Sequence, residues 1–141
     1  MFPMRIDEER ARSLFGAARV VRLATVDGEG RPHLVPVVFA LQGEVVVLAV
    51  DRKPKRSTNL KRLRNIAVNP SVTLLADHYD ENWAQLWWVR ADGKARVLSG
   101  AEAVEPLGWL TAKYSQYLLE PPPGPVMWID VSVWRGWAAI G

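Results

Sequence analysis

The chain has 141 residues, of which 49% are hydrophobic and 23% are charged, as is typical of a soluble globular domain. We expect a single domain, residues 1–141, with its own core. The absence of cysteine excludes disulfides and thiolate metal sites and favours a cytoplasmic location. No apolar run approaches the ~20 residues that span a bilayer, and the start lacks a signal-peptide core. We therefore predict no membrane partner, and with only two histidines no metal site.

The first predicted element is a short amphipathic helix over residues 7–16. Asp7 is suited to cap its N-terminus, and acidic residues follow in the first turn, where they interact favourably with the helix dipole. Gly16 is a plausible stop, since glycine commonly ends helices. This helix is expected to cover one end of a barrel.

Three strands are predicted next, over residues 20–26, 32–41 and 45–50. A turn of hairpin chemistry joins the first two. Pro32 and Pro36 each lack a backbone donor, so the second strand should lie at a sheet edge or carry a bulge. The third strand is continuously apolar and reads as fully buried. Together the three predict an antiparallel meander.

A focused cluster of positive charge follows. Between Arg52 and Arg64 there are seven basic residues and no acid. Seven of the 18 Lys and Arg residues thus lie here. The rest of the chain has 11 basic residues against 15 acidic ones and is therefore net acidic. Such a cluster suits a compact anion, for example a phosphate group. A solvated basic helix face is the alternative.

A helix is predicted within this cluster, from Ser57 or Thr58 as cap to Val68, with Asn69 and Pro70 ending it. A helix N-terminus beside basic side chains is a ready anion site. The predicted apolar face consists of Leu60, Leu63, Ile66 and Ala67, which leaves Lys61, Arg62 and Arg64 for solvent or a ligand.

In the second half of the chain, strands are predicted over residues 71–77, 86–98 and 126–140, and a helix over residues 101–119. Asp92-Gly93 could form a hairpin turn or a bulge, and we prefer one long strand because the period-two pattern continues through it. In the last strand, alternation predicts two faces: Met127, Ile129, Val131 and Val133 on one, and Trp128, Asp130, Ser132 and Trp134 on the other.

About six strands, with helices as covers or connectors, predict a mainly β fold, an antiparallel β-barrel with flanking helices. An open α+β sheet is the alternative. The seven tryptophans are expected mainly in the core or at a subunit interface, where large amphipathic rings are favoured. Some are candidates for walls around a flat aromatic ligand.

No catalytic constellation stands out. Acyl-transfer chemistry would need a histidine, and the choices are His33, predicted at a strand surface, and His78, predicted in an acidic loop. There is no Gly-rich phosphate loop and no dinucleotide fingerprint. We therefore predict no catalytic side chain, and a bound cofactor that carries the chemistry.

Three segments resemble one known family: residues 22–37 (RLATVDGEGRPHLVPV), 61–75 (KRLRNIAVNPSVTLL) and 87–97 (WWVRADGKARV). They are similar to the opening hairpin, the basic helix ending in Asn-Pro, and the strand with a central glycine in the split β-barrel proteins related to pyridoxamine 5′-phosphate oxidase. The closest resemblance is to the branch of F420-dependent oxidoreductases. It implies a six-stranded antiparallel split β-barrel that forms a homodimer with the cofactor at the subunit interface.

The resemblance also implies cofactor-binding residues. Lys61 and Arg62 match the paired basic phosphate ligands of the family. The connection before them is longer than in many relatives and adds further candidates, so that this loop, or both halves of the cluster, would hold the phosphate. The remaining positions implied beside the ring, in the loop or as walls are Val35, Pro36, Val37, Val50, Asp51, Lys53, Lys55, Arg56, Ser57, Thr58, Trp87 and Trp134.

The function implied is hydride transfer between F420 and a small conjugated substrate. Extra cations suit a cofactor with a phosphodiester and an anionic tail. The alternatives are an FMN-dependent oxidoreductase and a non-catalytic cofactor-binding protein. From another class, a barrel that binds single-stranded nucleic acid is less favoured, because the positive charge is focal and the rest of the chain is acidic. The C-terminal Trp/Arg signature of true pyridoxamine-phosphate oxidases is not evident.

Overall fold

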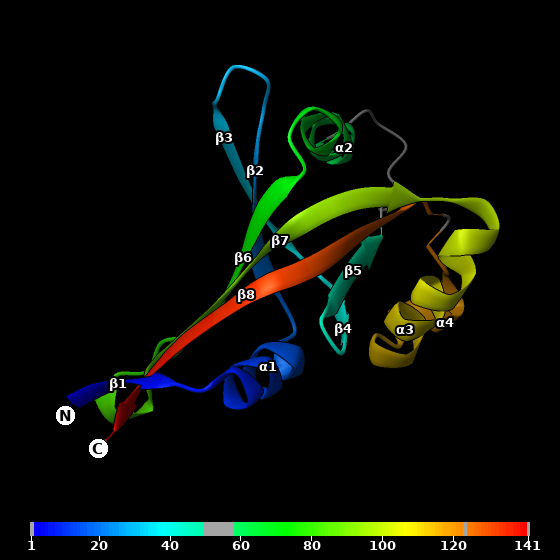
Figure 1. Ribbon diagram of the computed structural model, residues 1–141. Helices are drawn as coiled ribbons and strands as arrows, with labels where there is room; N and C mark the ends of the chain where they lie inside the picture. Colours follow the sequence, from blue (N-terminus) through cyan, green and yellow to red (C-terminus); the bar gives the residue numbers. More distant parts are fainter. Residues whose placement is uncertain (1, 50–57, 123, 141) are drawn as a thin grey trace.

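The computed structural model describes residues 2–49, 58–122 and 124–140, which form one curved antiparallel sheet with helices against it (Figure 1). The strands are β1 (Phe2–Ile6), β2 (Val21–Val26), β3 (Pro32–Val37), β4 (Ala40–Gln42), β5 (Val45–Ala49), β6 (Ser71–His78), β7 (Trp87–Leu98) and β8 (Val126–Ile140). The helices are α1 (Glu8–Ala17), α2 (Thr58–Val68), α3 (Val104–Lys113) and α4 (Gln116–Leu119), with 3₁₀ turns η1 (Trp83–Gln85) and η2 (Gly100–Ala103).

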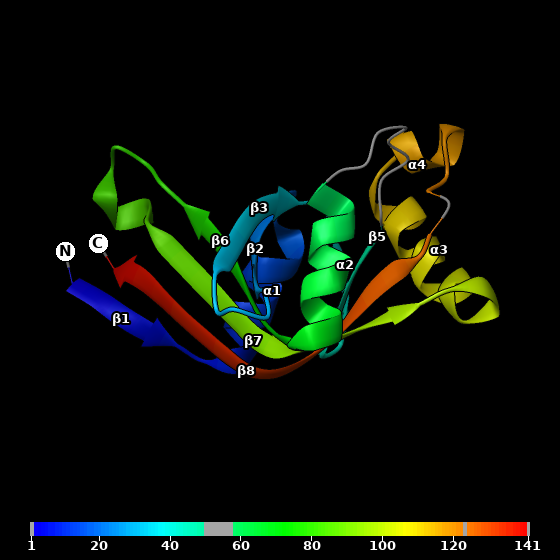
Figure 2. The same cartoon turned by 90° about the horizontal axis from the view of Figure 1, so that it is seen from above.

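The strand order is β3-β2-β6-β7-β8-β5-β4, and β1 pairs with β8 outside this path. The two longest strands, β7 and β8, lie at the centre and pair along their whole length. The other edge of β8 is shared, since β5 pairs with its first residues and β1 with its last. The two ends of the chain therefore lie close together (Figure 2). This mainly β arrangement confirms the predicted split β-barrel fold.

Two apolar clusters hold the fold together. The larger one fills the concave side of the sheet, where α1 and α2 cover it, and it includes the edge-to-face rings of Phe15, Phe39 and Trp134. The smaller one packs β4 and β5 against α3. Side chains of β5 alternate between the two clusters, Val46 and Leu48 in one and Val47 and Ala49 in the other. This explains the continuously apolar strand predicted there.

The predicted meander is wrong. Residues 32–41 do not form one strand but divide into β3 and β4, and the β4–β5 hairpin pairs with β8 at the opposite end of the sheet from β3. The backbone of Phe39, at the break, bonds to the Tyr114 hydroxyl instead of to a strand. β3 itself is an edge strand, as its two prolines predicted.

Three further boundaries differ from the prediction. Strand β1 was not predicted, because it forms by pairing with β8, at least 130 residues away along the chain. Helix α1 continues one residue past Gly16, where a Cβ would come within 3.2 Å of the Leu41 side chain. The helix predicted over residues 101–119 breaks at Tyr114, whose backbone is extended. No helix in the described part of the chain is long and apolar enough to cross a membrane.

The long strand β7 is confirmed, and its irregularity lies in the pairing with β8. Asp92 pairs with Val133 but Gly93 pairs with Val131, so Ser132 is an extra residue that forms a bulge in β8. Gly93 is required at this point, because a Cβ there would overlap the carbonyl oxygen of Asp130.

The bulge also corrects the predicted faces of β8. Met127, Ile129 and Val131 face the core as expected. Beyond Ser132 the alternation is reversed, so the core side chain is Trp134 rather than Val133. An inserted residue shifts every following side chain to the other face of the sheet.

Candidate functional site

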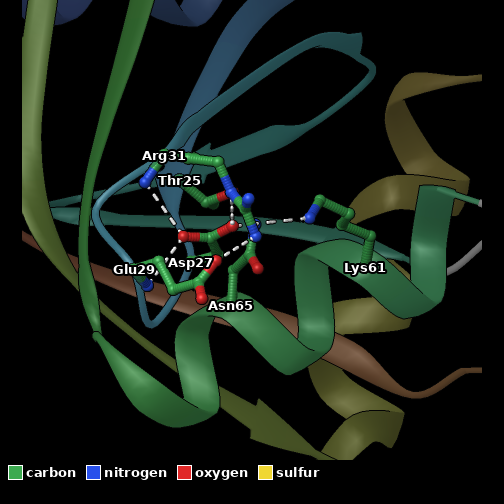
Figure 3. A network of polar contacts seen from close by, with 6 residues as sticks. All are labelled: Thr25, Asp27, Glu29, Arg31, Lys61 and Asn65. Carbon is green, nitrogen blue, oxygen red and sulfur yellow. Dashed lines mark hydrogen bonds and ion pairs between the residues drawn. The ribbon is translucent and has the colours of Figure 1, made fainter.

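Helix α2 lies against the β2–β3 hairpin and brings its basic residues to that hairpin (Figure 3). The amide of Asn65 donates to the Thr25 hydroxyl over 3.0 Å, and both side chains are buried. Ile66 packs in the core beside them. The face that α2 buries therefore differs from the predicted one, because Arg62, Asn65 and Ile66 are buried while Ala67 is exposed.

The hairpin turn is held by the carboxylate of Asp27. It accepts hydrogen bonds from the backbone N–H groups of Glu29 and Arg31 and from Nε of Arg31, each at 2.9 Å. The pKa of Asp27 is lowered to about 2, and the largest cause is the hydrogen bond from the Arg31 backbone N–H. Nζ of Lys61 lies 3.8 Å from the same carboxylate and so links α2 to the turn (Figure 3).

The other basic residues of this contact face the core side of the hairpin. Arg62 is only 7% exposed, which is unusual for arginine. His33 lies opposite Thr25 in the β2–β3 pairing, and its pKa is lowered by burial first and then by the charges of Lys61 and Arg62. Its Nδ1 is buried and has no hydrogen-bond partner in the described part of the chain.

This cluster of Lys61, Arg62 and His33 fits an anionic group. Two fixed cations raise the local potential, and a neutral imidazole can donate one hydrogen bond to a phosphate oxygen. We define these three residues as the cation cluster. Neither histidine was a predicted ligand, and the proximity of His33 to α2 follows from the hairpin packing rather than from any sequence spacing.

Of the predicted ring-binding residues on β3, Val35 and Val37 point toward the core and Pro36 points away from it and is exposed. Thr58 is the first residue of α2. The remaining predicted loop ligands lie outside the described residues: Val50, Asp51, Lys53, Lys55, Arg56 and Ser57. Whether these or the α2 residues hold a phosphate therefore stays a prediction.

The two tryptophans predicted as walls lie in different surroundings. Trp134 is in the core, 6% exposed, with its indole N–H donating to Oε1 of Glu44 over 2.6 Å. Its size is thus accounted for by packing within the chain. Trp87 instead lies at a cavity, where its ring stacks with that of His78 at 6.3 Å between centroids.

That cavity has a volume of about 450 Å³, within the usual range for small-molecule sites. It lies where β6, β7 and the end of β8 meet, and the sequence did not predict it. Only the register of β7 and β8 shows that Trp88 and Trp137 are neighbours. The lining residues are Leu75, Asp77, His78, Tyr79, Leu86, Trp87, Trp88, Arg90 and Trp137.

A second hollow, of about 380 Å³, lies farther along the sheet. Its polar side chains bond to one another: the Thr73 hydroxyl to Asp92 at 3.0 Å, and Nζ of Lys94 to the Ser71 hydroxyl at 2.6 Å. These groups are already satisfied within the chain, so this hollow is the weaker candidate for a ligand.

The chain is similar to known proteins over nearly its whole length. Residues 7–138 match the family model described as pyridoxamine 5′-phosphate oxidase. An FAD-binding protein from Mesorhizobium loti has a TM-score of 0.76 at 17% identity, with 99% of each chain covered. An FAD-binding protein from Mycobacterium smegmatis has a TM-score of 0.63 at 15% identity, covering 96% of this chain and 97% of that one.

A heme-binding protein from Mycobacterium smegmatis also has this fold, with a TM-score of 0.72 at 21% identity over 94% of this chain and 53% of that one. No curated protein sequence matches the chain significantly. At these identities the solved structures show the fold alone, so the ligands they are named for do not carry over to this chain.

Proposed function

Because the chain belongs to the pyridoxamine 5′-phosphate oxidase family, we propose that it is an oxidoreductase with a bound flavin-type cofactor, F420 in the first place. When bound, F420 supplies two-electron chemistry as a hydride. The protein then has to bind and orient the cofactor and exclude water from its ring. No described side chain is assigned as a nucleophile.

The observation that carries this proposal is the cation cluster where α2 meets the β2–β3 hairpin. Arg62 and Lys61 would hold the phosphate, and His33 would donate a hydrogen bond to it. The backbone of β3, an edge strand, has peptide groups free of a second strand and can bond to the edge of a flat ring. The apolar side chains of Val35 and Val37 on the same strand would keep water away from the ring.

FMN is the second candidate. It is supported by the fold shared with two proteins named as FAD-binding, and its single phosphate would need only part of the basic cluster. We further propose, from the resemblance to the family, that two copies of the chain form a homodimer with the cofactor at their interface.

Titration of the purified protein with F420 and with FMN, followed by absorption and fluorescence, tests the proposal. We expect saturable F420 binding and weaker FMN binding. Lys61→Ala/Arg62→Ala should weaken F420 binding at least tenfold, since charge-assisted hydrogen bonds are among the stronger ones. The Lys53→Ala/Lys55→Ala pair shows in the same assay what the loop contributes.

The control is Arg96→Gln, an exposed arginine on β7, which should leave affinity unchanged. Because Arg62 is buried, thermal unfolding of each variant has to show that the fold is kept, and Lys61→Ala alone serves if the pair does not fold. If the wild-type protein binds neither cofactor but binds oligonucleotides in a salt-sensitive way, the proposal is wrong.

A further inference from the structure

Most residues that line the 450 Å³ cavity lie on the face of the sheet that points away from the core, whereas Trp87 and His78 have the core-side alternation and Trp87 also packs against the larger cluster. Leu74 and Ala76 of β6 and Val89 of β7 face the core, so the residues between them, Leu75, Asp77 and Trp88, face the other way. Neither α1 nor α2 covers this face, because both pack on the core side. The cavity is therefore distinct from the cation cluster beneath α2.

Its walls are aromatic and lie in register. Trp88 pairs with Trp137 across β7 and β8, and Trp87 pairs with His78 across β6 and β7, with the two rings stacked. Tyr79 and the aliphatic Leu75 and Leu86 complete the apolar lining. The cross-strand pair of Trp88 and Trp137 on the outer face favours a flat, aromatic ligand, because stacked or edge-on aromatic pairs gain energy beyond area burial.

The indole N–H groups distinguish these tryptophans from three others. Trp83, Trp128 and Trp134 each donate to a side-chain oxygen of the protein. Across the described ranges, Trp87, Trp88 and Trp137 donate to none. All three line the cavity, so their N–H groups are available there as donors to solvent or to a ligand. Donors without acceptors favour a ligand that carries oxygen atoms rather than a purely hydrocarbon one.

Arg90 adds a positive charge to this lining. Its Nε lies 3.3 Å from Oδ1 of Asp92 but makes no hydrogen bond there, and that Asp92 oxygen already accepts from Thr73. Asp77, the carboxylate among the lining residues, lies 3.5 Å from Nη1 of Arg22 and is compensated by it. Arg90 is thus ion-paired with Asp92 through its buried Nε, and the groups that it can offer an anion are its terminal Nη N–H groups.

From these contacts we propose that the cavity binds a planar aromatic anion, with its ring between the tryptophans and its carboxylate on Arg90. That this ligand is the substrate of the redox reaction rests on the proposed function, whereas the binding itself does not. The proposal gives the unknown substrate a chemical class and assigns its recognition to Trp88, Trp137 and Arg90.

The test uses the whole chain without cofactor and titrates it calorimetrically with 2-naphthoate and with the uncharged 2-naphthylmethanol. We expect the anion to bind about tenfold more tightly, as one charge-assisted hydrogen bond supplies. Arg90→Gln should remove this preference and leave the affinity for the alcohol unchanged. Trp137→Leu should weaken the binding of both compounds.

The matched control is Arg96→Gln. Arg96 lies on the same strand and its guanidinium is 5.4 Å from the Trp128 ring, but it does not line the cavity, so the preference should persist. Equal binding of naphthoate by the wild-type protein and Arg90→Gln overturns the proposal, and so does failure to bind either compound at millimolar concentration.

Two further measurements distinguish the proposed naphthoate site from the proposed cofactor binding and from a contact between two copies of the chain. Arg90→Gln should keep the wild-type affinity for F420 or FMN, because the two sites are separate. If the wild-type protein binds neither cofactor but still binds naphthoate, the proposed function is contradicted and the naphthoate site is not. If Trp137→Leu instead turns a dimer into a monomer and naphthoate does not bind, the cavity is a contact between copies and the proposal is wrong.

Discussion

The Tyr114 hydroxyl supports the break between β3 and β4. It accepts a hydrogen bond from the Phe39 backbone N–H at 3.1 Å and lies 2.9 Å from the carbonyl oxygens of both Phe39 and Arg19. A phenol has one proton, so it donates to one of these carbonyls at a time. Burial raises the pKa of Tyr114, which keeps the hydroxyl protonated and able to donate.

Replacing Tyr114 by Phe removes only the oxygen and leaves the ring in place. The N–H and the C=O of Phe39, a residue with no exposed surface, then lose their partner. An unsatisfied buried polar group costs ~1–3 kcal/mol. For two such groups we expect Tyr114→Phe to lower the free energy of unfolding by about 2–6 kcal/mol, a large fraction of the ~5–15 kcal/mol typical of a domain.

Urea unfolding followed by circular dichroism measures this difference. Tyr79→Phe is the matched control, since Tyr79 is 63% exposed and surface changes usually stay within ~0.5 kcal/mol. If Tyr114→Phe costs less than about 1 kcal/mol at an unchanged m-value, the Phe39 groups have other partners. The argument that this hydroxyl stabilises the break would then be refuted.

Two further predictions concern a close approach of strands and a half-buried amine. Gly93→Ala should destabilise the chain by ~3 kcal/mol or more in urea unfolding, because the new Cβ meets the Asp130 backbone and overpacking against atoms that cannot rotate away is costly. Gly108→Ala, with open space in α3, should instead stabilise by ~0.5–1 kcal/mol, and equal effects would contradict the packing argument. Burial, followed by the Arg19 charge, lowers the pKa of Lys113 to about 8 from an ordinary 10.5. Between these pH values the unfolded chain holds a proton that the folded chain does not, so this group's contribution to stability rises with pH. Lys113→Met should flatten that rise between pH 7.5 and 9.5, and an unchanged slope would show that the amine titrates normally.

Local chemistry explains how much of the fold was predictable. Asp7 caps α1 through its own side chain, Asn69-Pro70 ends α2, and the prolines of β3 mark an edge. Each of these depends on residues within a few positions of one another. The β4–β5 hairpin could not be placed in this way, because its pairing with β8 depends on contacts with residues 126–130.

The side-chain orientations show the same limit. A period-two pattern predicts the faces of β8 only up to Ser132, since the bulge arises from the approach of the Gly93 backbone on β7. Likewise, the helical pattern put Arg62 on the solvent side, but the hairpin packs against that side of α2 and buries it. In both cases the error comes from a neighbouring segment that the local pattern does not contain.

The two candidate sites lie on opposite faces of the sheet. His33 of the cation cluster and its cross-strand partner Thr25 share the core-side face with Leu23, whereas Trp88 and Arg90 point to the other face. A cofactor held beneath α2 and a ligand held at the tryptophans are therefore separated by the sheet itself. Within one copy they would meet only around an edge or end of the sheet, and otherwise across two copies of the chain. If both proposals hold, the proposed homodimer would bring the outer face of one copy to the β3 edge of the other.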